Sequence, residues 1–134
     1  MERTMIPRFR AWDKEFKEMV QVDALVFDEQ IIKATYKNGN VVKDDLKNYV
    51  LMQSTGLRDK NDIEIFEGDI LKVTNLSSWL EVVSFNEDKA MFVSKETKRK
   101  VEETPLYDLF NTDIFEVEII GNIHTNPELA EVKQ

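Results

Sequence analysis

Three carboxylates near the middle of the chain come closest to a reactive site. Glu64, Glu67 and Asp69 lie within six residues, and clustered carboxylates bind divalent cations or transfer protons in many enzymes. A structural role competes with that chemistry. Glu64 alternates with Ile63 and Ile65, which predicts a solvent-facing strand position, and an Asp at such a corner bonds nearby backbone amides. We favour the structural role and predict no catalytic site and no metal site here.

The remaining residue types offer little enzyme chemistry. His124 is the single histidine and there are no cysteines, so multi-histidine metal sites, cysteine metal sites, thiol nucleophiles and disulfides are excluded. Gly56, Gly68 and Gly121 are too far apart for a phosphate-binding loop. His124 stands just before a helix-start pattern, and we interpret it as a partly exposed packing residue rather than a catalytic base. The chain is therefore predicted to be no enzyme and to need no cofactor.

One dense basic run is the candidate nucleic-acid site. Its members are Lys95, Lys98, Arg99 and Lys100. In a nucleic-acid patch, phosphate contacts from such residues combine with stacking of bases on aromatic rings. Further members would be Arg8, Arg10, Trp12 and Trp79. The acidity of the whole chain favours a solvated loop instead.

Negative charge gathers in the last quarter of the chain. The formal net charge is −8, and from Glu102 to Val132 there are eight acids and no lysine or arginine. Residues 1–101 hold 17 basic and 18 acidic side chains. Generic nucleic-acid binding depends on clustered lysine and arginine, so this balance disfavours it. Spaced carboxylates over 102–132 could mimic DNA phosphates and occupy a basic host protein, but we prefer an ordinary acidic surface.

Composition places the chain among soluble globular proteins. Its 134 residues suffice for one core or two small modules, with 42% hydrophobic and 33% charged residues. No apolar run approaches the roughly 20 residues that a membrane helix needs. The first residues lack the apolar core of a secretory signal. We therefore expect a cytoplasmic protein without membrane contact.

Short strands joined by tight turns are predicted along most of the chain. The clearest are at residues 31–36, 79–85, 90–93 and 114–120. Asn38-Gly39 predicts a type I′ hairpin turn. Residues 13–27 fit either an amphipathic helix or two strands, and we prefer strands because the neighbouring segments are β-rich. In the centre, a strand at 50–53 is expected to end in a turn at 54–56.

These elements predict a mainly β fold with some α character. Its short antiparallel strands are expected to form a C-terminal SH3-like barrel or roll, because closure removes exposed strand edges. One or two short helices are expected, at 105–110 with Thr104 as cap and at 127–131. The predicted domains are an N-terminal β portion (1–50) packed on the barrel, a connecting segment (51–62), and the barrel with its short terminal helix (63–134).

Three segments spread over the chain carry a family resemblance. RFRAWDKEFKEM spans residues 8–19, LMQSTGLRDKNDIEIFEGDIL spans 51–71 and EVEIIGNIHTNPELA spans 116–130. In this order they resemble the YopX family of phage and prophage proteins. The middle segment departs from the family pattern at Asp62, where a glycine is expected, and at Ser54, where an aromatic is more usual. The resemblance implies a phage-derived cytosolic protein with an SH3-like barrel, and it brings no established activity.

The functional expectation is an accessory protein of a phage or prophage, working in the cytoplasm of a bacterial host. It is predicted to act without catalysis, by binding a host or phage protein, and a homo-oligomer is a further expectation. Two alternatives stay open. One is a nucleic-acid-associated barrel module that uses the basic run at 95–100, and the other is an acidic DNA mimic that binds a host protein.

Overall fold

Strands make up nearly all of the regular structure in the computed structural model, which describes residues 6–131. Within those residues the helical segments are three 3₁₀ turns, η1 (Leu46–Asn48), η2 (Leu106–Leu109) and η3 (Pro127–Ala130). None of them has the length and hydrophobicity to cross a membrane. The mainly β prediction is confirmed. The chain divides into two compact units between Ser54 and Thr55.

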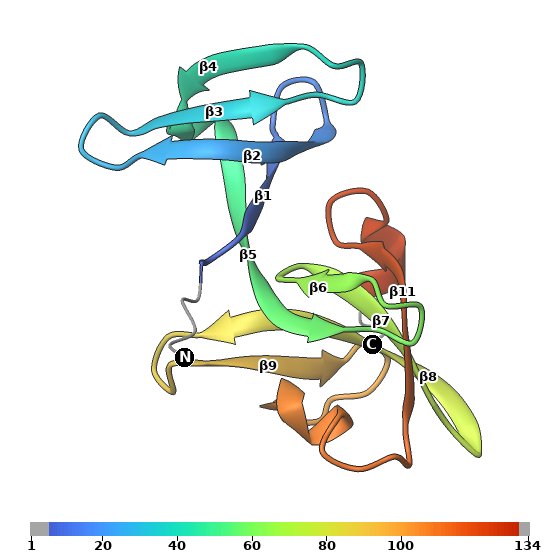
Figure 1. The fold of residues 1–134 in the computed structure, drawn as a ribbon. Coiled ribbons are helices and arrows are strands. Elements are labelled where there is room, and N and C mark those ends of the chain that lie inside the picture. The colour runs from blue at the N-terminus through green and yellow to red at the C-terminus, as the bar shows by residue number, and fades with distance from the viewer. Residues whose placement is uncertain (1–5, 132–134) are drawn as a thin grey trace. The chain divides into compact units, whose positions relative to one another are not determined.

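The N-terminal unit is an antiparallel sheet in the order β4-β3-β2-β1-β5, coloured blue to green in Figure 1. Its strands are β1 (Phe9–Asp13), β2 (Glu18–Val26), β3 (Ile31–Thr35), β4 (Val41–Asp45) and the first part of β5 (Tyr49–Arg58). Ala11 on β1 lies opposite both Val20 and Leu51. With Ile32 and Ala34, these residues form a small core. Small and β-branched residues at alternating positions both favour the strands and bury one face.

The ambiguous segment at 13–27 forms a turn and one long strand, neither a helix nor two strands. Asp13 Oδ1 accepts hydrogen bonds from the backbone N–H of Glu15 and Phe16, and these bonds close the β1–β2 turn. The register of β2 against β3 shifts between Val22 and Ala24. This β-bulge explains why the apolar pattern looked broken around residue 23, because a bulge changes which face the following side chains occupy.

The β3–β4 hairpin lies where the Asn-Gly pair predicted it, but the turn type differs. Tyr36 N–H donates to Asn40 O at 2.8 Å and Gly39 N–H donates to Tyr36 O at 2.9 Å. Gly39 has a φ of +90°, whereas Asn38 is not among the residues with positive φ. A type I′ turn needs two positive φ angles, so this prediction is wrong. The hairpin is a type I turn followed by a left-handed glycine, the usual three-residue loop.

The central strand β5 is longer than predicted. It continues to Arg58 through residues 54–56, where a turn was expected. Thr55 Oγ1 donates to Ile65 O at 2.8 Å and accepts from Leu57 N–H at 3.1 Å. Gly56 has a φ of +81° inside the strand. The polar residues therefore mark a local irregularity within a strand, and Gly56 absorbs it.

The C-terminal unit contains the larger core. Its strands are the end of β5, β6 (Glu64–Phe66), β7 (Asp69–Asn75), β8 (Ser77–Asn86), β9 (Met91–Glu96), β10 (Thr104–Pro105) and β11 (Glu116–Asn122). Five of them form an antiparallel sheet in the order β10-β9-β8-β7-β11. Buried aliphatic side chains fill the core, each worth about 1.5–3 kcal/mol when fully buried. They are Ile65, Leu71, Val73, Val83, Leu106, Leu109 and Val117.

Neither sheet closes on itself within residues 6–131. The expected SH3-like barrel is therefore not confirmed, and open sheets are the supported description. Two local predictions also need correction. Thr104 and Pro105 form the short strand β10, so η2 begins at Leu106 without a side-chain cap. In the polar segment thought to lack core residues, Ser94 and Thr97 are buried.

Candidate functional site

Of the three central carboxylates, Asp69 supports the structure of the corner. Asp69 is buried and accepts a hydrogen bond from Phe66 N–H at 2.8 Å. Gly68 O accepts from Ile123 N–H at 2.9 Å. The corner therefore lies beside the segment that holds His124. Within the described residues no group of three or more His, Cys, Asp or Glu side chains could hold a metal ion.

His124 lies in a tight loop whose organising residue is Asn122. The Oδ1 atom of Asn122 accepts from the backbone N–H of His124 at 3.0 Å and of Thr125 at 2.9 Å. His124 is partly buried. Neither it nor Glu67 nor Asp69 lines any of the three hollows described below. The geometry thus gives no support to an acid–base pair at this corner.

The four candidate nucleic-acid residues are all exposed, but they are not all in a loop. Lys95 belongs to β9, whereas Lys98, Arg99 and Lys100 follow the strand. Arg99 forms a two-pronged contact with Glu96, with Nε at 2.9 Å from Oε1 and a terminal nitrogen at 3.1 Å from Oε2. This pairing engages the Arg99 charge inside the chain and leaves three lysines to make a patch.

A hollow of about 560 Å³ in the N-terminal unit is the best-built candidate site. We call it the acidic hollow. It is lined by four carboxylates and two tyrosines, together with smaller contributions from neighbouring residues. The carboxylates are those of Asp13, Glu15, Glu18 and Asp44, and the tyrosines are Tyr36 and Tyr49. The residues come from β1, the β1–β2 turn, β2, the β3–β4 hairpin, β4 and β5. Only the folded sheet gathers them.

A continuous chain of hydrogen bonds crosses the floor of this hollow. Tyr36 OH donates its proton to Asp13 Oδ2 at 2.5 Å, so Tyr49 OH is the donor to the Tyr36 oxygen at 2.7 Å and shares the same proton with Asp44 Oδ2 at 3.2 Å. Burial raises the pKa of Tyr36 well above its ordinary value, and the Asp13 contact raises it further. Burial also raises the pKa of Tyr49. Both hydroxyls therefore keep their protons: Tyr36 donates to Asp13, and Tyr49 donates to Tyr36 with a weaker shared contact to Asp44.

Asp13 keeps its charge although it is buried. Burial alone would raise its pKa, but the bonds from Tyr36 and from the backbone N–H groups of Phe16 and Glu15 outweigh that effect and lower it. The result is a fixed negative charge at the base of the hollow. Hydrogen-bond donors placed around a carboxylate hold it in one orientation.

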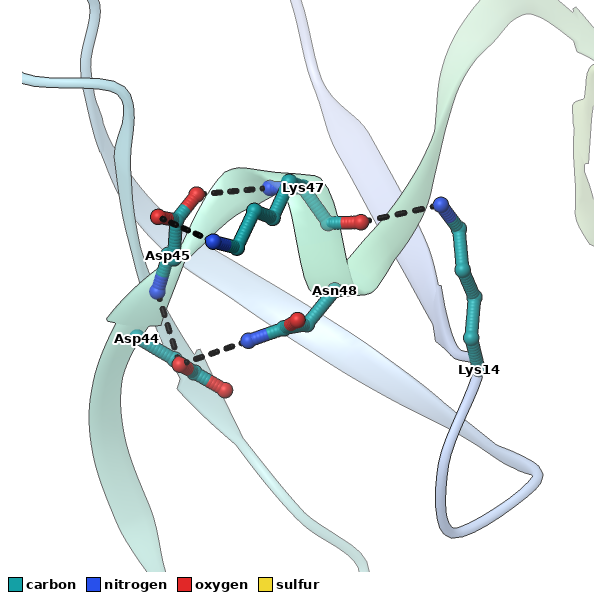
Figure 2. A network of polar contacts seen from close by, with 5 residues as sticks. All are labelled: Lys14, Asp44, Asp45, Lys47 and Asn48. Carbon is teal, nitrogen blue, oxygen red and sulfur yellow. Dashed lines mark hydrogen bonds and ion pairs between the residues drawn. The ribbon is translucent and has the colours of Figure 1, made fainter.

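A second set of contacts fixes Asp44 at the other end (Figure 2). Asp44 Oδ1 accepts from Asp45 N–H at 2.7 Å and from Asn48 Nδ2 at 3.0 Å. Asp45 caps η1 by accepting from Lys47 N–H at 2.9 Å, and Lys14 Nζ donates to Lys47 O at 2.9 Å. These hydrogen bonds hold the short η1 turn in place, and they orient the Asp44 carboxylate without a ligand.

The electrostatics of the hollow favour a cation. Its lining contains four carboxylates and a single ammonium group, that of Lys43. Within residues 6–131 none of these four carboxylates forms an ion pair with lysine or arginine. Phe16 also lines the hollow and is 71% exposed. Carboxylates beside an open aromatic ring suit a cationic group on an apolar stem, which describes a lysine or arginine side chain.

No pattern in the sequence predicted this site. Its carboxylates are separated by up to 31 positions, from Asp13 to Asp44. The Asn-Gly pair predicted the β3–β4 hairpin, which contributes Asn38 and Asn40 to the lining. The pairing order β4-β3-β2-β1-β5 could not be predicted from the sequence. That order brings the segments together around the hollow.

Two further hollows lie in the C-terminal unit. One, of about 580 Å³, has the buried Glu81 at its base, which accepts from Trp79 Nε1 at 2.8 Å and from Ser94 Oγ at 2.6 Å. The other, of about 470 Å³, has Lys60 and Glu116 in its lining, and these two form an ion pair at 3.4 Å. In both, most of the charged groups already have partners within the unit. These hollows are weaker candidates than the acidic hollow.

Fold and site together define a small, mainly β protein of two antiparallel sheets with an acidic hollow and no metal-holding cluster within the described residues. The family model described as YopX protein matches residues 8–131. The chain therefore belongs to the YopX family, as its three sequence segments indicated.

One solved structure extends this likeness to the fold. The crystal structure of protein EF1440 from Enterococcus faecalis is similar over 96% of this chain and 100% of that chain, with 29% sequence identity and a TM-score of 0.63. No curated protein matches this chain.

Proposed function

We propose that the protein is a phage or prophage accessory protein that acts by binding another protein, without catalysing a reaction. Membership of the YopX family supports this proposal. One structural observation carries it. The acidic hollow holds four carboxylates without an ion pair to lysine or arginine within residues 6–131. An excess of negative charge on a preformed surface attracts a partner of opposite sign.

The partner in this proposal presents lysine or arginine side chains to the hollow. Its ammonium or guanidinium group lies among the carboxylates, while its alkyl stem packs on Phe16. The proposal places the interaction in the cytoplasm of a bacterial host. An SH3-like roll for the C-terminal unit and a homo-oligomeric state stay predictions within it.

Affinity capture from prophage-induced cells tests this function. The bait is the whole chain, compared with a Glu15→Gln, Glu18→Gln double variant that lowers the charge of the hollow. The matched control is Glu87→Gln with Asp88→Asn, an equal charge change at an exposed turn of the C-terminal unit. We expect a protein that the wild type and the control retain and the double variant loses. Equal retention by all three would contradict the proposal.

A nucleic-acid-associated module is the second candidate, favoured by the exposure of Lys95, Lys98 and Lys100. The pairing of Arg99 with Glu96 and the net charge of −8 count against it. Its test is salt-dependent retention of DNA or RNA that disappears in a Lys98→Glu, Arg99→Glu variant.

The acidic DNA-mimic alternative is weaker, because Lys60 is paired with both Glu116 and Glu118 on that surface.

A further inference from the structure

Within residues 6–131, one edge of the N-terminal sheet has no further strand paired to it. β4 is the outermost strand in the order β4-β3-β2-β1-β5 and pairs with β3 on one side. Two backbone hydrogen bonds flank the β3–β4 pairing, one at each end: Tyr36 N–H donates to Asn40 O and Leu46 N–H donates to Gln30 O. Because bonded pairs alternate in an antiparallel ladder, Val42 and Asp44 bond toward β3. The backbone groups of Val41 and Lys43 therefore point outward, toward any strand added alongside.

The edges of the C-terminal sheet are protected instead. Its outer strand β10 has two residues, one of them Pro105, which has no N–H to offer. At the other edge, Val117 O accepts from Lys60 N–H at 2.8 Å and Ile119 N–H donates to Asp59 Oδ2 at 2.9 Å. Proteins usually cover or shorten exposed edges in this way. β4 has five residues, no proline and no such cover among the described residues.

The open edge and the acidic hollow share the same strand. Val42, Lys43 and Asp44 all line the hollow, and Val42 also packs against the core of the unit. Side chains alternate between the two faces of a sheet. In a strand added beside β4, every second side chain would therefore lie on the face of Val42 and Asp44, next to the hollow.

We propose that β4 accepts an extended segment of another protein that carries lysine or arginine at alternating positions. The backbone of this segment bonds to Val41 and Lys43, and one of its cationic side chains enters the acidic hollow. This inference rests on the proposed function and adds the conformation of the partner to it. Strand addition to a free sheet edge obtains affinity from backbone bonds and specificity from alternate side chains.

A second copy of this chain fits the edge poorly. Antiparallel pairing of β4 with itself about its middle residue would place Lys43 opposite Lys43, and like charges directly opposite are destabilising. The same pairing would bring two acidic hollows together. The charge of the site therefore selects a basic partner over a copy of itself.

Peptide binding to the whole chain tests the inference. The probe is a labelled peptide of about eight residues in which lysine alternates with threonine. The first comparison peptide has glutamine in place of lysine. The second keeps the lysines but has methylated backbone nitrogens at alternate positions, which removes the N–H donors without changing the protein. Binding is followed by fluorescence anisotropy at low and high salt, and hydrogen exchange of the Lys43 amide is followed by NMR.

The inference predicts that the alternating lysine peptide binds at least about tenfold more tightly than either comparison peptide, since losing even one or two good hydrogen bonds costs roughly that factor. It also predicts slower exchange at Lys43 in the complex. Lys43→Pro removes one outward N–H and places the proline ring where the added strand would lie, so it should weaken binding of the lysine peptide to the level of its methylated form.

Three results would overturn the inference. In the first, the lysine and methylated peptides bind equally well, and the Glu15→Gln, Glu18→Gln variant binds both more weakly. That result would leave the proposed function standing and rule out strand addition. No binding of any basic peptide at low salt would remove both. Concentration-dependent self-association that protects the Lys43 amide without peptide would identify a second copy as the occupant.

Discussion

At the scale of single residues, the account depends on four side chains that hold one another in place. Asp13, Tyr36, Tyr49 and Asp44 form a chain of hydrogen bonds across the base of the acidic hollow. Asp13 and Tyr49 are buried. A buried carboxylate is tolerated only where donors satisfy it. The same bonds that stabilise the N-terminal unit therefore also preserve the charge of its candidate site.

The first prediction concerns the Tyr36 hydroxyl. Tyr36→Phe removes the donor to Asp13 Oδ2 and leaves that buried oxygen without its side-chain hydrogen bond. We expect a loss of about 1–3 kcal/mol in the free energy of unfolding, because a buried acceptor loses its partner. Urea denaturation measures it. The control is Tyr107→Phe, at an exposed position, which should change stability by less than about 0.5 kcal/mol. Equal effects of the two substitutions would contradict the chain of bonds.

At the scale of elements, turns tie each sheet together, and Asp59 is the clearest case. Its Oδ1 accepts from the backbone N–H of Asn61 and Ile63, and its Oδ2 accepts from Ile119 N–H on β11. One carboxylate therefore closes the turn after β5 and covers the edge of the C-terminal sheet. A resemblance to an active-site carboxylate is superficial, since all of its bonds go to backbone N–H groups within the unit.

Acid unfolding tests this role of Asp59. Burial would raise its pKa, but the bonds from Ile119, Ile63 and Asn61 lower it below the ordinary value. A carboxyl whose folded pKa lies below its unfolded pKa adds stability above the unfolded value, near pH 4, and loses it as the pH falls through the folded pKa. We expect Asp59→Asn to be less stable than wild type at pH 7 and to lose less stability between pH 4 and pH 2. The exposed Asp88→Asn variant should follow the wild-type profile. A profile for Asp59→Asn parallel to wild type would refute the assignment.

The Glu67-Gly68-Asp69 corner gives a second prediction at this scale. Gly68 is buried, has a φ of +86°, and bonds through N–H to Val83 O at 2.8 Å and through O to Ile123 N–H at 2.9 Å. Gly68→Val should destabilise the fold by about 2 kcal/mol or more, because a β-branched residue is strained at positive φ. Glu67→Gln keeps the side-chain shape and should have a small effect. Thermal unfolding compares the two, and equal losses would show that the corner is not held by its glycine.

At the scale of the whole molecule, local signals predicted much of the fold. Apolar alternation located the strands at 31–36 and 79–85, and the Asn-Gly pair located a hairpin. The closed barrel was inferred only because short strands need edge protection, and the structure provides that protection differently, through Pro105 and the turn at Asp59. The acidic hollow escaped prediction because the strand order of the sheet assembles it, and strand order leaves no local pattern in the sequence.

The most direct test of the account locates a cationic ligand on the folded protein. In an NMR titration of the whole chain with a lysine-containing peptide at low salt, we predict amide shifts concentrated at Glu15, Phe16, Tyr36, Lys43 and Asp44. The shifts should fade in the Glu15→Gln, Glu18→Gln variant and persist in the Glu87→Gln, Asp88→Asn control. Shifts confined to the C-terminal unit, or no shifts at any peptide concentration, would contradict the claim that the acidic hollow binds a basic partner.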